Sequence, residues 1–241
     1  MGDPMTYEDI VSLLGYAGGH EQAVRITTTD QTEVVGIPMD GAGMDMGCFE
    51  QQLAVRRPKL VYTIPAFHNP TGQVMDRARR DRLVALSREH GFIIVADEVY
   101  QHLYHGDPPP PSFGTLGAAG NVLSLGSFSK ILAPGLRLGW IQTTPDLMKT
   151  LLASGALVSG GNFNHFTSHI VRKLLESGEL AVNVACLRAS YAERAQAMDV
   201  ALRKHLAGVA RWQKPGGGYF FWLELPDGAD AAALEAGARA A

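Results

Sequence analysis

Cysteine, charge and long apolar stretches are all scarce in this sequence. Cys48 and Cys186 are its two cysteines, and their wide separation argues against a disulfide framework or a zinc site. The formal net charge is −3 with no run of five like charges, which argues against a nucleic-acid groove or an anionic membrane surface as partner. No apolar run approaches the roughly 18 residues of a membrane-spanning helix. We therefore expect a protein of the reducing cytoplasm that binds neither nucleic acid nor membrane.

Residues that favour burial or turns are abundant instead. The 241 residues are 46% hydrophobic and 19% charged, and the charged share lies below the roughly 25% of typical soluble domains. The 27 glycines predict many tight turns, or backbone lying close to a ligand. The first ten residues lack the basic start and apolar centre of a signal peptide. This length suits one large domain or two small ones with a substantial core.

Four short apolar runs predict buried strands. They are near-continuous rather than alternating, as expected of strands covered on both faces. The runs are KLVYTIP (59–65), FIIVAD (92–97), NVLSLGS (121–127) and RLGWIQT (137–143). An amphipathic helix is predicted over 75–91, with Leu83, Val84 and Leu86 as its apolar stripe, arginines as its solvated face and Gly91 as its stop. Strand, helix and strand form a βαβ unit, so we predict an α/β fold with a mostly parallel sheet flanked by helices.

The pattern becomes helical after residue 144. Two shorter helices are predicted at 145–155 and 164–178, followed by a long amphipathic helix. A hairpin-like pair of strands with a glycine-rich turn follows in ARWQKPGGGYFFWLELP (210–226), and then an alanine-rich helical stretch. This change predicts a partial large domain over residues 1–180 and part of a smaller α+β domain over 181–241.

Polar side chains follow three of the predicted strands at the point where each strand ends. In chain order they are Asn69, then Asp97 and Tyr100, then Ser127, Ser129 and Lys130. Ligands of open parallel sheets bind beyond the carboxyl ends of the strands, so we expect these groups at one edge. Arg137 begins the fourth predicted strand. If that strand runs antiparallel, which a six-residue connection with a Pro-Gly pair allows, Arg137 joins them.

These groups together have the chemistry that one cofactor requires. Partly apolar surroundings and a nearby arginine disfavour the charged form of a lysine, and a neutral amine attacks a carbonyl to form a Schiff base. An arginine fork and hydroxyls bind a phosphate, a carboxylate holds a cationic ring nitrogen, and a phenol and an amide donate to a phenolate oxygen. Each residue alone is more often structural. The joint arrangement favours pyridoxal 5'-phosphate.

Four motifs mark these strand ends and carry a resemblance. They are NPTG (69–72), ADEVY (96–100), GSFSK (126–130) and APGLRLGW (133–140). In order and spacing they resemble the class I/II aminotransferases, which are pyridoxal-phosphate enzymes of fold type I. LRASYAERAQAM (187–198) and PGGGYFFWLELP (215–226) are similar to that family's interdomain helix and small-domain hairpin. The resemblance implies transfer of an amino group from an amino acid to a 2-oxo acid.

The resemblance also implies a role for each site residue. Lys130 would form the Schiff base and then shuttle a proton, and Asp97 would pair with the ring nitrogen. Tyr100 and Asn69 would hydrogen-bond the 3' oxygen of the ring, and the Asn69–Pro70 bond would be cis. The phosphate would be bound by Ser127, Ser129 and Arg137. Tyr7 matches a tyrosine that lies near the cofactor in some relatives.

Two departures from the family lead us to expect a fragment. No glycine-rich phosphate loop precedes Tyr7, and Arg239, the one arginine beyond the predicted hairpin, lies in an alanine-rich stretch unlike the family's carboxylate-binding motif. The family resemblance implies a homodimer for the full-length form. The portion expected to be missing would hold part of the phosphate cup and of the substrate pocket, so the substrate side chain stays open.

Other interpretations remain open at this point. The same cofactor supports elimination at a C–S bond or decarboxylation, and a sensor domain of a transcription regulator would bind it without turnover. A fragment that cannot hold a stable core is a further alternative. His165 and His169, four residues apart on a predicted helix, resemble a metal pair, but without a third ligand in view ordinary helix-face histidines are favoured.

Overall fold

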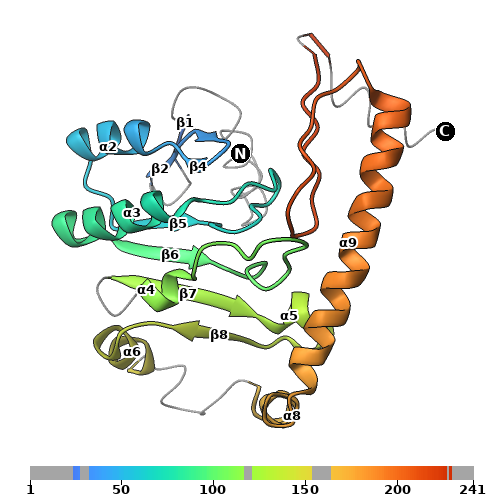
Figure 1. Ribbon diagram of the computed structural model, residues 1–241. Coiled ribbons are helices and arrows are strands. Elements are labelled where there is room, and N and C mark those ends of the chain that lie inside the picture. Colours follow the sequence, from blue (N-terminus) through green and yellow to red (C-terminus); the bar gives the residue numbers. More distant parts are fainter. Residues whose placement is uncertain (1–23, 28–32, 117–120, 154–163, 227, 230–241) are drawn as a thin grey trace, which may run out of the picture.

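The computed structural model describes residues 24–27, 33–116, 121–153, 164–226 and 228–229, and the structural statements below concern those residues (Figure 1). A four-stranded sheet forms the middle of the molecule, with helices packed around it and one long helix along one end. The predicted alanine-rich helix after residue 229 lies outside the described residues.

The central sheet has the strand order β5-β6-β7-β8. Its strands are β5 (Leu60–Thr63), β6 (Ile93–Asp97), β7 (Val122–Ser127) and β8 (Gly139–Gln142). The first three run parallel, with Leu60 opposite Ile93 and Ile94 opposite Val122, whereas β8 runs antiparallel to β7. The predicted α/β class and mostly parallel sheet are therefore confirmed, and the antiparallel β8 meets the condition under which Arg137 was expected to join the strand ends.

Burial differs from strand to strand. Ile94, Ala96 and Val122 are completely buried, and burial alternates along β6 because successive side chains point to opposite faces. Most of β8 is exposed, including Ile141 at 44%. The expectation that all four strands are covered on both faces is therefore wrong for β8 within the described part of the chain.

Helix α3 (Arg77–His90) connects β5 to β6 and starts and stops on local signals. The Asp76 side chain caps its N-terminus by accepting from the Arg79 N–H, and Gly91 ends it in the left-handed conformation at φ 77°. Leu83 and Leu86 are buried against Phe92, as the apolar stripe predicts. The predicted βαβ unit is confirmed.

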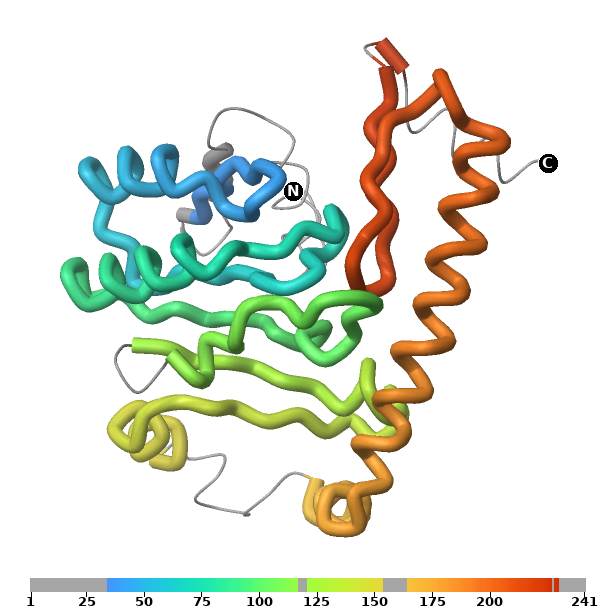
Figure 2. The backbone as a smooth tube through the Cα atoms, in the orientation of Figure 1, coloured from blue at the N-terminus to red at the C-terminus, as the bar shows by residue number. Residues whose placement is uncertain are grey.

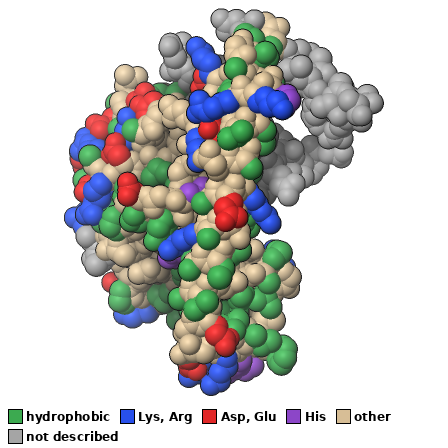
Figure 3. All heavy atoms as spheres, turned by 45° about the vertical axis from the view of Figure 1, so that its right-hand side comes forward, with side chains coloured by type: hydrophobic (Ala, Val, Ile, Leu, Met, Phe, Trp, Pro, Cys, Tyr) green, Lys and Arg blue, Asp and Glu red, His purple; other side chains and the backbone are tan. Residues whose placement is uncertain are grey.

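The remaining helices lie around the sheet and along its end. They are α2 (Met46–Val55), α4 (Phe113–Leu116), α5 (Phe128–Ile131), the 3-10 helix η2 (Pro134–Leu136), α6 (Pro145–Leu152), α8 (His165–Glu176) and α9 (Glu179–Leu206). The 28-residue α9 runs along one end of the sheet. Its exposed surface carries Val182, Met198 and Val200, and Figure 3 shows hydrophobic side chains scattered along this helix among polar ones.

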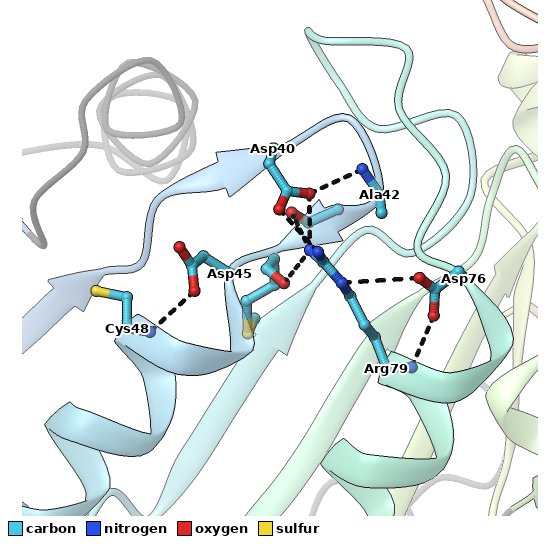
Figure 4. A network of polar contacts seen from close by, with 8 residues as sticks. Asp40, Ala42, Asp45, Cys48, Asp76 and Arg79 are labelled. Carbon is cyan, nitrogen blue, oxygen red and sulfur yellow. Dashed lines mark hydrogen bonds and ion pairs between the residues drawn. The ribbon is translucent and has the colours of Figure 1, made fainter.

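Two small antiparallel pairs precede α2. They are β1 (Val24–Thr27) with β2 (Glu33–Gly36), and β3 (Met39–Asp40) with β4 (Gly43–Met44). Arg79 of α3 holds the second pair, because its guanidinium contacts both carboxylate oxygens of Asp40 at 2.7 Å and donates to the Met44 carbonyl at 2.8 Å (Figure 4).

Residues 209–226, called the C-terminal arm here, double back beside α9 (Figures 1 and 2). Its two limbs pair through one bridge, in which Arg211 and Glu224 exchange N–H···O bonds of 2.9 and 2.8 Å. Neither limb forms a regular strand among the described residues, so the predicted pair of strands is wrong in that respect. The predicted reversal of the chain at the glycine run is correct.

Buried side chains form two clusters. The first, around Leu83, Phe92 and Ile94, lies between the sheet and the helices α2 and α3. The second includes Tyr100 and Phe128 and takes Leu180, Tyr191 and Phe220 from the later part of the chain. It therefore combines both sides of the predicted boundary at residues 180 and 181, and that boundary stays a prediction.

Candidate active site

The carboxyl ends of the three parallel strands meet at one edge of the sheet. Thr63 at the end of β5 lies opposite Ala96, and Asp97 at the end of β6 lies opposite Leu125. The chain leaves this edge into the loop 64–76, into Glu98 and the turn after it, and into α5. The expected convergence of the three strand ends is confirmed.

Asp97 has one satisfied and one unsatisfied carboxylate oxygen. The Tyr62 hydroxyl donates to Oδ2 at 2.7 Å, whereas Oδ1 is buried and has no hydrogen-bond partner within the described structure. A buried carboxylate oxygen without a donor is costly, and native proteins rarely leave one so. The position therefore suits a bound molecule that brings its own N–H donor.

Tyr62 was not predicted from the sequence. It lies opposite Val95 in the parallel ladder, and Asp97 is two residues further along β6, so both side chains project from the same face. The register of β5 against β6, had it been known, would have identified Tyr62 as the neighbour of Asp97.

Tyr100 follows Asp97 within the second cluster. It is 4% exposed, and burial, followed by the Asp97 charge, raises the pKa of its phenol. Its ring makes edge contacts with Tyr219 and Phe220 at centroid distances of 5.5 and 5.9 Å. The phenol thus stays protonated and able to donate at neutral pH.

Lys130 lies in the short helix α5, directly after β7. Ser127 caps that helix, its Oγ accepting from the Ser129 N–H at 3.1 Å. The Lys130 amine lies 5.9 Å from the centre of the Tyr219 ring, and the Tyr219 hydroxyl donates to the Lys130 carbonyl at 2.9 Å. Tyr219 comes from the C-terminal arm and was not assigned to the site from the sequence.

Arg137 differs from its predicted placement. It ends η2 in the left-handed conformation at φ 48°, two residues before β8, and so does not begin that strand. It still lies at the same edge, because Ser127 pairs with Gly139 and the Phe128 N–H donates to the Leu138 carbonyl at 3.1 Å. A non-glycine residue in this conformation is uncommon and often marks a functional position. Its side chain is exposed.

Asn69 lies in the loop 64–76, and the predicted cis bond to Pro70 is present. Two backbone hydrogen bonds close the loop: the Gly72 N–H donates to the His68 carbonyl at 2.7 Å, and the Met75 N–H donates to the Pro65 carbonyl at 2.9 Å. Asn69 and Tyr62 line a cavity of about 850 Å³ beside β5, but Asp97, Ser127 and Lys130 do not. The candidate site is therefore defined by the strand ends and not by this cavity.

A buried ion pair between Arg80 and Glu98 lies next to the segments that carry Asn69 and Asp97. Arg80 is completely buried, so the prediction of a solvated arginine face on α3 is wrong for this residue. Its guanidinium donates to the carbonyls of Pro65, Met75 and Pro111 at 2.9 to 3.0 Å and lies 3.5 Å from Glu98. Burial lowers the pKa of Arg80 to about 10, so it is still charged at neutral pH. Arg80 thus joins the loop of Asn69 to the residue after Asp97.

Glu98 completes this pair. It accepts from the Ser124 hydroxyl at 2.6 Å and from the Phe113 N–H at 3.0 Å. Burial raises the pKa of its carboxyl above the usual value, although these bonds and the Arg80 charge act in the opposite direction. Through these bonds and its ion pair with Arg80, Glu98 links β6, β7 and α4, and such partners offset the cost of burying a carboxyl group.

Comparison with known proteins identifies the family of the chain. The family described as aminotransferase class I and II matches residues 9–236. The chain belongs to this aminotransferase family. Its four-stranded sheet and flanking helices are thus part of the fold-type I architecture, as predicted.

Individual aminotransferases are similar over most of this chain. The aromatic-amino-acid aminotransferase 1 of Thermococcus litoralis is 38% identical over 83% of the chain and 49% of the relative. The multiple substrate aminotransferase of Thermococcus profundus has 35% identity and a TM-score of 0.78, over 85% of this chain and 52% of that one. LysN of Thermus thermophilus, an α-aminoadipate aminotransferase complexed with N-(5'-phosphopyridoxyl)-L-leucine, has 33% identity and a TM-score of 0.74, over 82% and 51%. The chain spans about half the length of these relatives.

Two sequence predictions for this chain lie apart from the site just described. Tyr7 falls outside the described residues. His165 and His169 are exposed on α8 with ring centroids 4.6 Å apart, and no group of three or more potential metal ligands occurs in the part of the chain that the structure covers. None of the described helices is long and apolar enough to span a membrane.

Proposed function

We propose that this chain is the lysine-bearing part of a pyridoxal-phosphate-dependent aminotransferase, which moves an amino group from an amino acid to a 2-oxo acid. The observation that carries the proposal is the buried Oδ1 of Asp97, which lacks a hydrogen-bond partner among the described residues and lies at the sheet edge that also bears Lys130. A protonated ring nitrogen would supply the missing donor and the opposite charge. Family membership and the phosphopyridoxyl ligand of LysN support the same group.

The residues at the edge divide the work of holding this cofactor. Asp97, oriented by Tyr62, would hold the ring nitrogen, and Tyr100 and Asn69 would donate to the 3' oxygen. The phosphate would be bound by Ser127, Ser129 and Arg137. Lys130 would hold the aldehyde carbon, and Tyr7 stays a predicted neighbour.

When bound, pyridoxal phosphate supplies an electron sink that stabilises negative charge at the α-carbon of the substrate. Lys130 Nζ would take the proton from that carbon and deliver it again during transfer. Asp97 would keep the ring nitrogen protonated because its carboxylate lies in a partly buried setting with a single phenol as competing donor. Tyr100 would donate its proton in a hydrogen bond without losing it, as the raised pKa of its phenol allows.

Several wider properties belong to the whole enzyme and are proposed with it. The substrates would be an amino acid and a 2-oxo acid, and the full-length form would be a cytoplasmic homodimer that binds no nucleic acid. We further propose the division into a large domain, 1–180, and a smaller one, 181–241. The relatives act on aromatic amino acids or on α-aminoadipate by their names, and one is bound to a leucine adduct. We therefore propose an amino-acid substrate with an aromatic, apolar or aminoadipate side chain, which substrate assays would identify.

Titration of the purified chain with pyridoxal phosphate tests the proposal. Condensation of the Lys130 amine with the aldehyde forms a C=N bond, releases water and produces a visible absorption band. Borohydride then adds hydride to that bond, and peptide mass spectrometry locates the modified lysine. We expect modification at Lys130 in the wild-type chain and no modification at that position in Lys130→Ala. Lys149→Ala is the control, because it removes an exposed lysine that pairs with Asp146 on α6, and it should still be modified at Lys130. Equal labelling of all lysines would contradict the proposal.

The alternatives are separated by products from the full-length protein. An aminotransferase converts the cofactor to its amine form with one equivalent of 2-oxo acid, whereas C–S elimination releases a thiol and decarboxylation releases carbon dioxide. A sensor domain binds the cofactor at Lys130 but gives no product with any amino acid. Thiol or carbon dioxide release, or binding without turnover, would each overturn the aminotransferase assignment.

A further inference from the structure

Tyr219 of the C-terminal arm reaches the lysine of the site from a segment 89 residues away in sequence. Its hydroxyl donates to the Lys130 carbonyl at 2.9 Å, and the face of its ring lies 5.9 Å from the Lys130 amine. The ring also contacts Tyr100 at 5.5 Å. One side chain thus binds the main chain of Lys130 and lies near both its amine and the ring of Tyr100.

The glycine run before Tyr219 fixes where this side chain emerges. The His105 N–H donates to the Gly216 carbonyl at 2.7 Å, and the Gly218 N–H donates to the Leu103 carbonyl at 2.9 Å. A Cβ at Gly217 would lie 2.5 Å from the Phe67 ring and 2.6 Å from the Leu103 oxygen. Since only glycine allows this approach, the arm lies close against the loop after β6, and Tyr219, two residues after Gly217, meets Lys130.

The hydrogen bond meets a need of α5. This helix has only four residues, and the last carbonyls of any helix lack a partner within it. Tyr219 satisfies the carbonyl of Lys130 itself. Partial burial of Tyr219, which stays 38% exposed, followed by the neighbouring Tyr191 hydroxyl at 3.4 Å, raises the pKa of the Tyr219 phenol, so it keeps the proton that it donates.

We propose that Tyr219 is a positioning residue for Lys130, its hydroxyl fixing the main chain that carries the amine and its ring fixing the surroundings of the amine. The inference deepens the proposed function and rests on it, because Lys130 is a reactive amine only in that function. The C-terminal arm is then part of the active site, and the later portion of the chain determines how well the lysine is presented.

Kinetics of cofactor attachment to the purified chain test this role. The measured quantities are the rate constant of Lys130 modification at saturating pyridoxal phosphate and the concentration giving half that rate. Tyr219→Phe keeps the ring and loses the hydrogen bond, and we expect its saturating rate constant to fall about two- to tenfold. Tyr219→Leu also loses the ring, and its saturating rate constant should fall further. The half-saturating concentration stays unchanged in both, because Tyr219 contacts the lysine and not the phosphate-binding serines.

A matched control and three outcomes decide the matter. Tyr104→Phe changes a tyrosine whose ring packs on Arg188 at 3.7 Å, and its attachment kinetics stay at the wild-type values. Wild-type saturating rates in both Tyr219 variants would overturn the inference, and so would a change confined to the half-saturating concentration, which indicates a merely structural effect. Absence of attachment at Lys130 in the wild-type chain would instead overturn the proposed function itself.

Discussion

Arg79 and Arg80 are neighbours in α3, but they lie in opposite surroundings. The side chain of Arg79 is 22% exposed and binds the half-exposed Asp40, whereas the side chain of Arg80 is 0% exposed and faces Glu98 at 3%. One step along a helix turns the side chain by about 100°, enough to move from one neighbouring layer to another. Two identical residues therefore belong to two separate networks.

The network of Arg79 holds a peripheral element. Its partners are Asp40, the capping residue Asp76 and the carbonyls of β4 (Figure 4). The Arg79 guanidinium, through its hydrogen bonds, lowers the pKa of the Asp40 carboxyl. Water reaches this network, so each charge would remain partly solvated if its partner were removed.

The network of Arg80 connects segments that carry the candidate site. Its three carbonyl partners lie on either side of the Asn69 loop and in the segment before α4, and its ionic partner follows Asp97. A charge in this setting depends on its partners because water is excluded. The contrast teaches that burial, and not residue type, determines how much each arginine matters to the site.

The largest expected effect comes from Arg80→Met. The substitution leaves the Glu98 charge buried without its partner and three carbonyls without their donor. We expect a loss of about 3–5 kcal/mol in the free energy of unfolding at neutral pH, measured by urea titration. Pyridoxal phosphate should also bind more weakly at a temperature where the variant is still folded, because the loop of Asn69 loses its anchor.

A double variant separates the pair from the packing. In Arg80→Met with Glu98→Gln no buried charge is left unpaired, so the double loss should be smaller than the sum of the single losses. Strict additivity would show that Arg80 acts through its carbonyl bonds and packing alone.

The second expected effect is on pH dependence. Burial raises the folded-state pKa of Glu98 above its usual value, so the folded state binds the proton more tightly. The contribution of this group to stability is complete below the unfolded pKa and is lost as pH rises through the folded pKa. The wild-type free energy of unfolding relative to Glu98→Gln should therefore fall as pH rises from about 4 toward 7.

Glu50→Gln is the matched control with the opposite sign. The Arg82 hydrogen bond lowers the pKa of Glu50, so its contribution is present above the unfolded pKa and is lost as pH falls. The two difference curves should slope in opposite directions, that of Glu50 more weakly because its pair is exposed. Parallel slopes would show that the burial of Glu98 does not govern its titration.

A smaller effect is expected from Arg79→Met. This substitution removes a two-pronged ion pair and the carbonyl bonds to β4, but solvent reaches the groups left behind. We expect a loss of about 1–2 kcal/mol by the same urea titration. Attachment of pyridoxal phosphate to Lys130 should be unchanged. A loss as large as that of Arg80→Met, or impaired attachment, would remove the distinction between the two networks.

Part of the site was predictable from the order of the chain alone. Asp97, Ser127 and Lys130 each follow a buried apolar run, and parallel pairing is enough to bring such positions to one edge. The cis bond between Asn69 and Pro70 was predicted from the family resemblance. These features depend on local sequence and on a single topological rule.

The remaining features depend on contacts that no local pattern encodes. Tyr62 meets Asp97 through the register between two strands, and Tyr219 meets Lys130 through the path of the C-terminal arm. Arg80 lies among five arginines of one helix, and the pattern does not tell which of them faces the loops. Arg137 precedes its strand because a turn of 3-10 helix uses the residues before it.

The smallest expected effect is that of Arg77→Ala, which completes the series along α3. Arg77 pairs with Asp81 one turn later at 2.8 Å, and both side chains are about half exposed, at 53% and 51%. Exposed pairs of this spacing contribute about 0.3–0.5 kcal/mol, partly offset here by the high helix propensity of alanine. The urea midpoint should therefore barely move, and high salt should remove the remaining difference. A loss above that of Arg79→Met would show that exposure does not rank these arginines, and the contrast between surface and buried networks would no longer explain them.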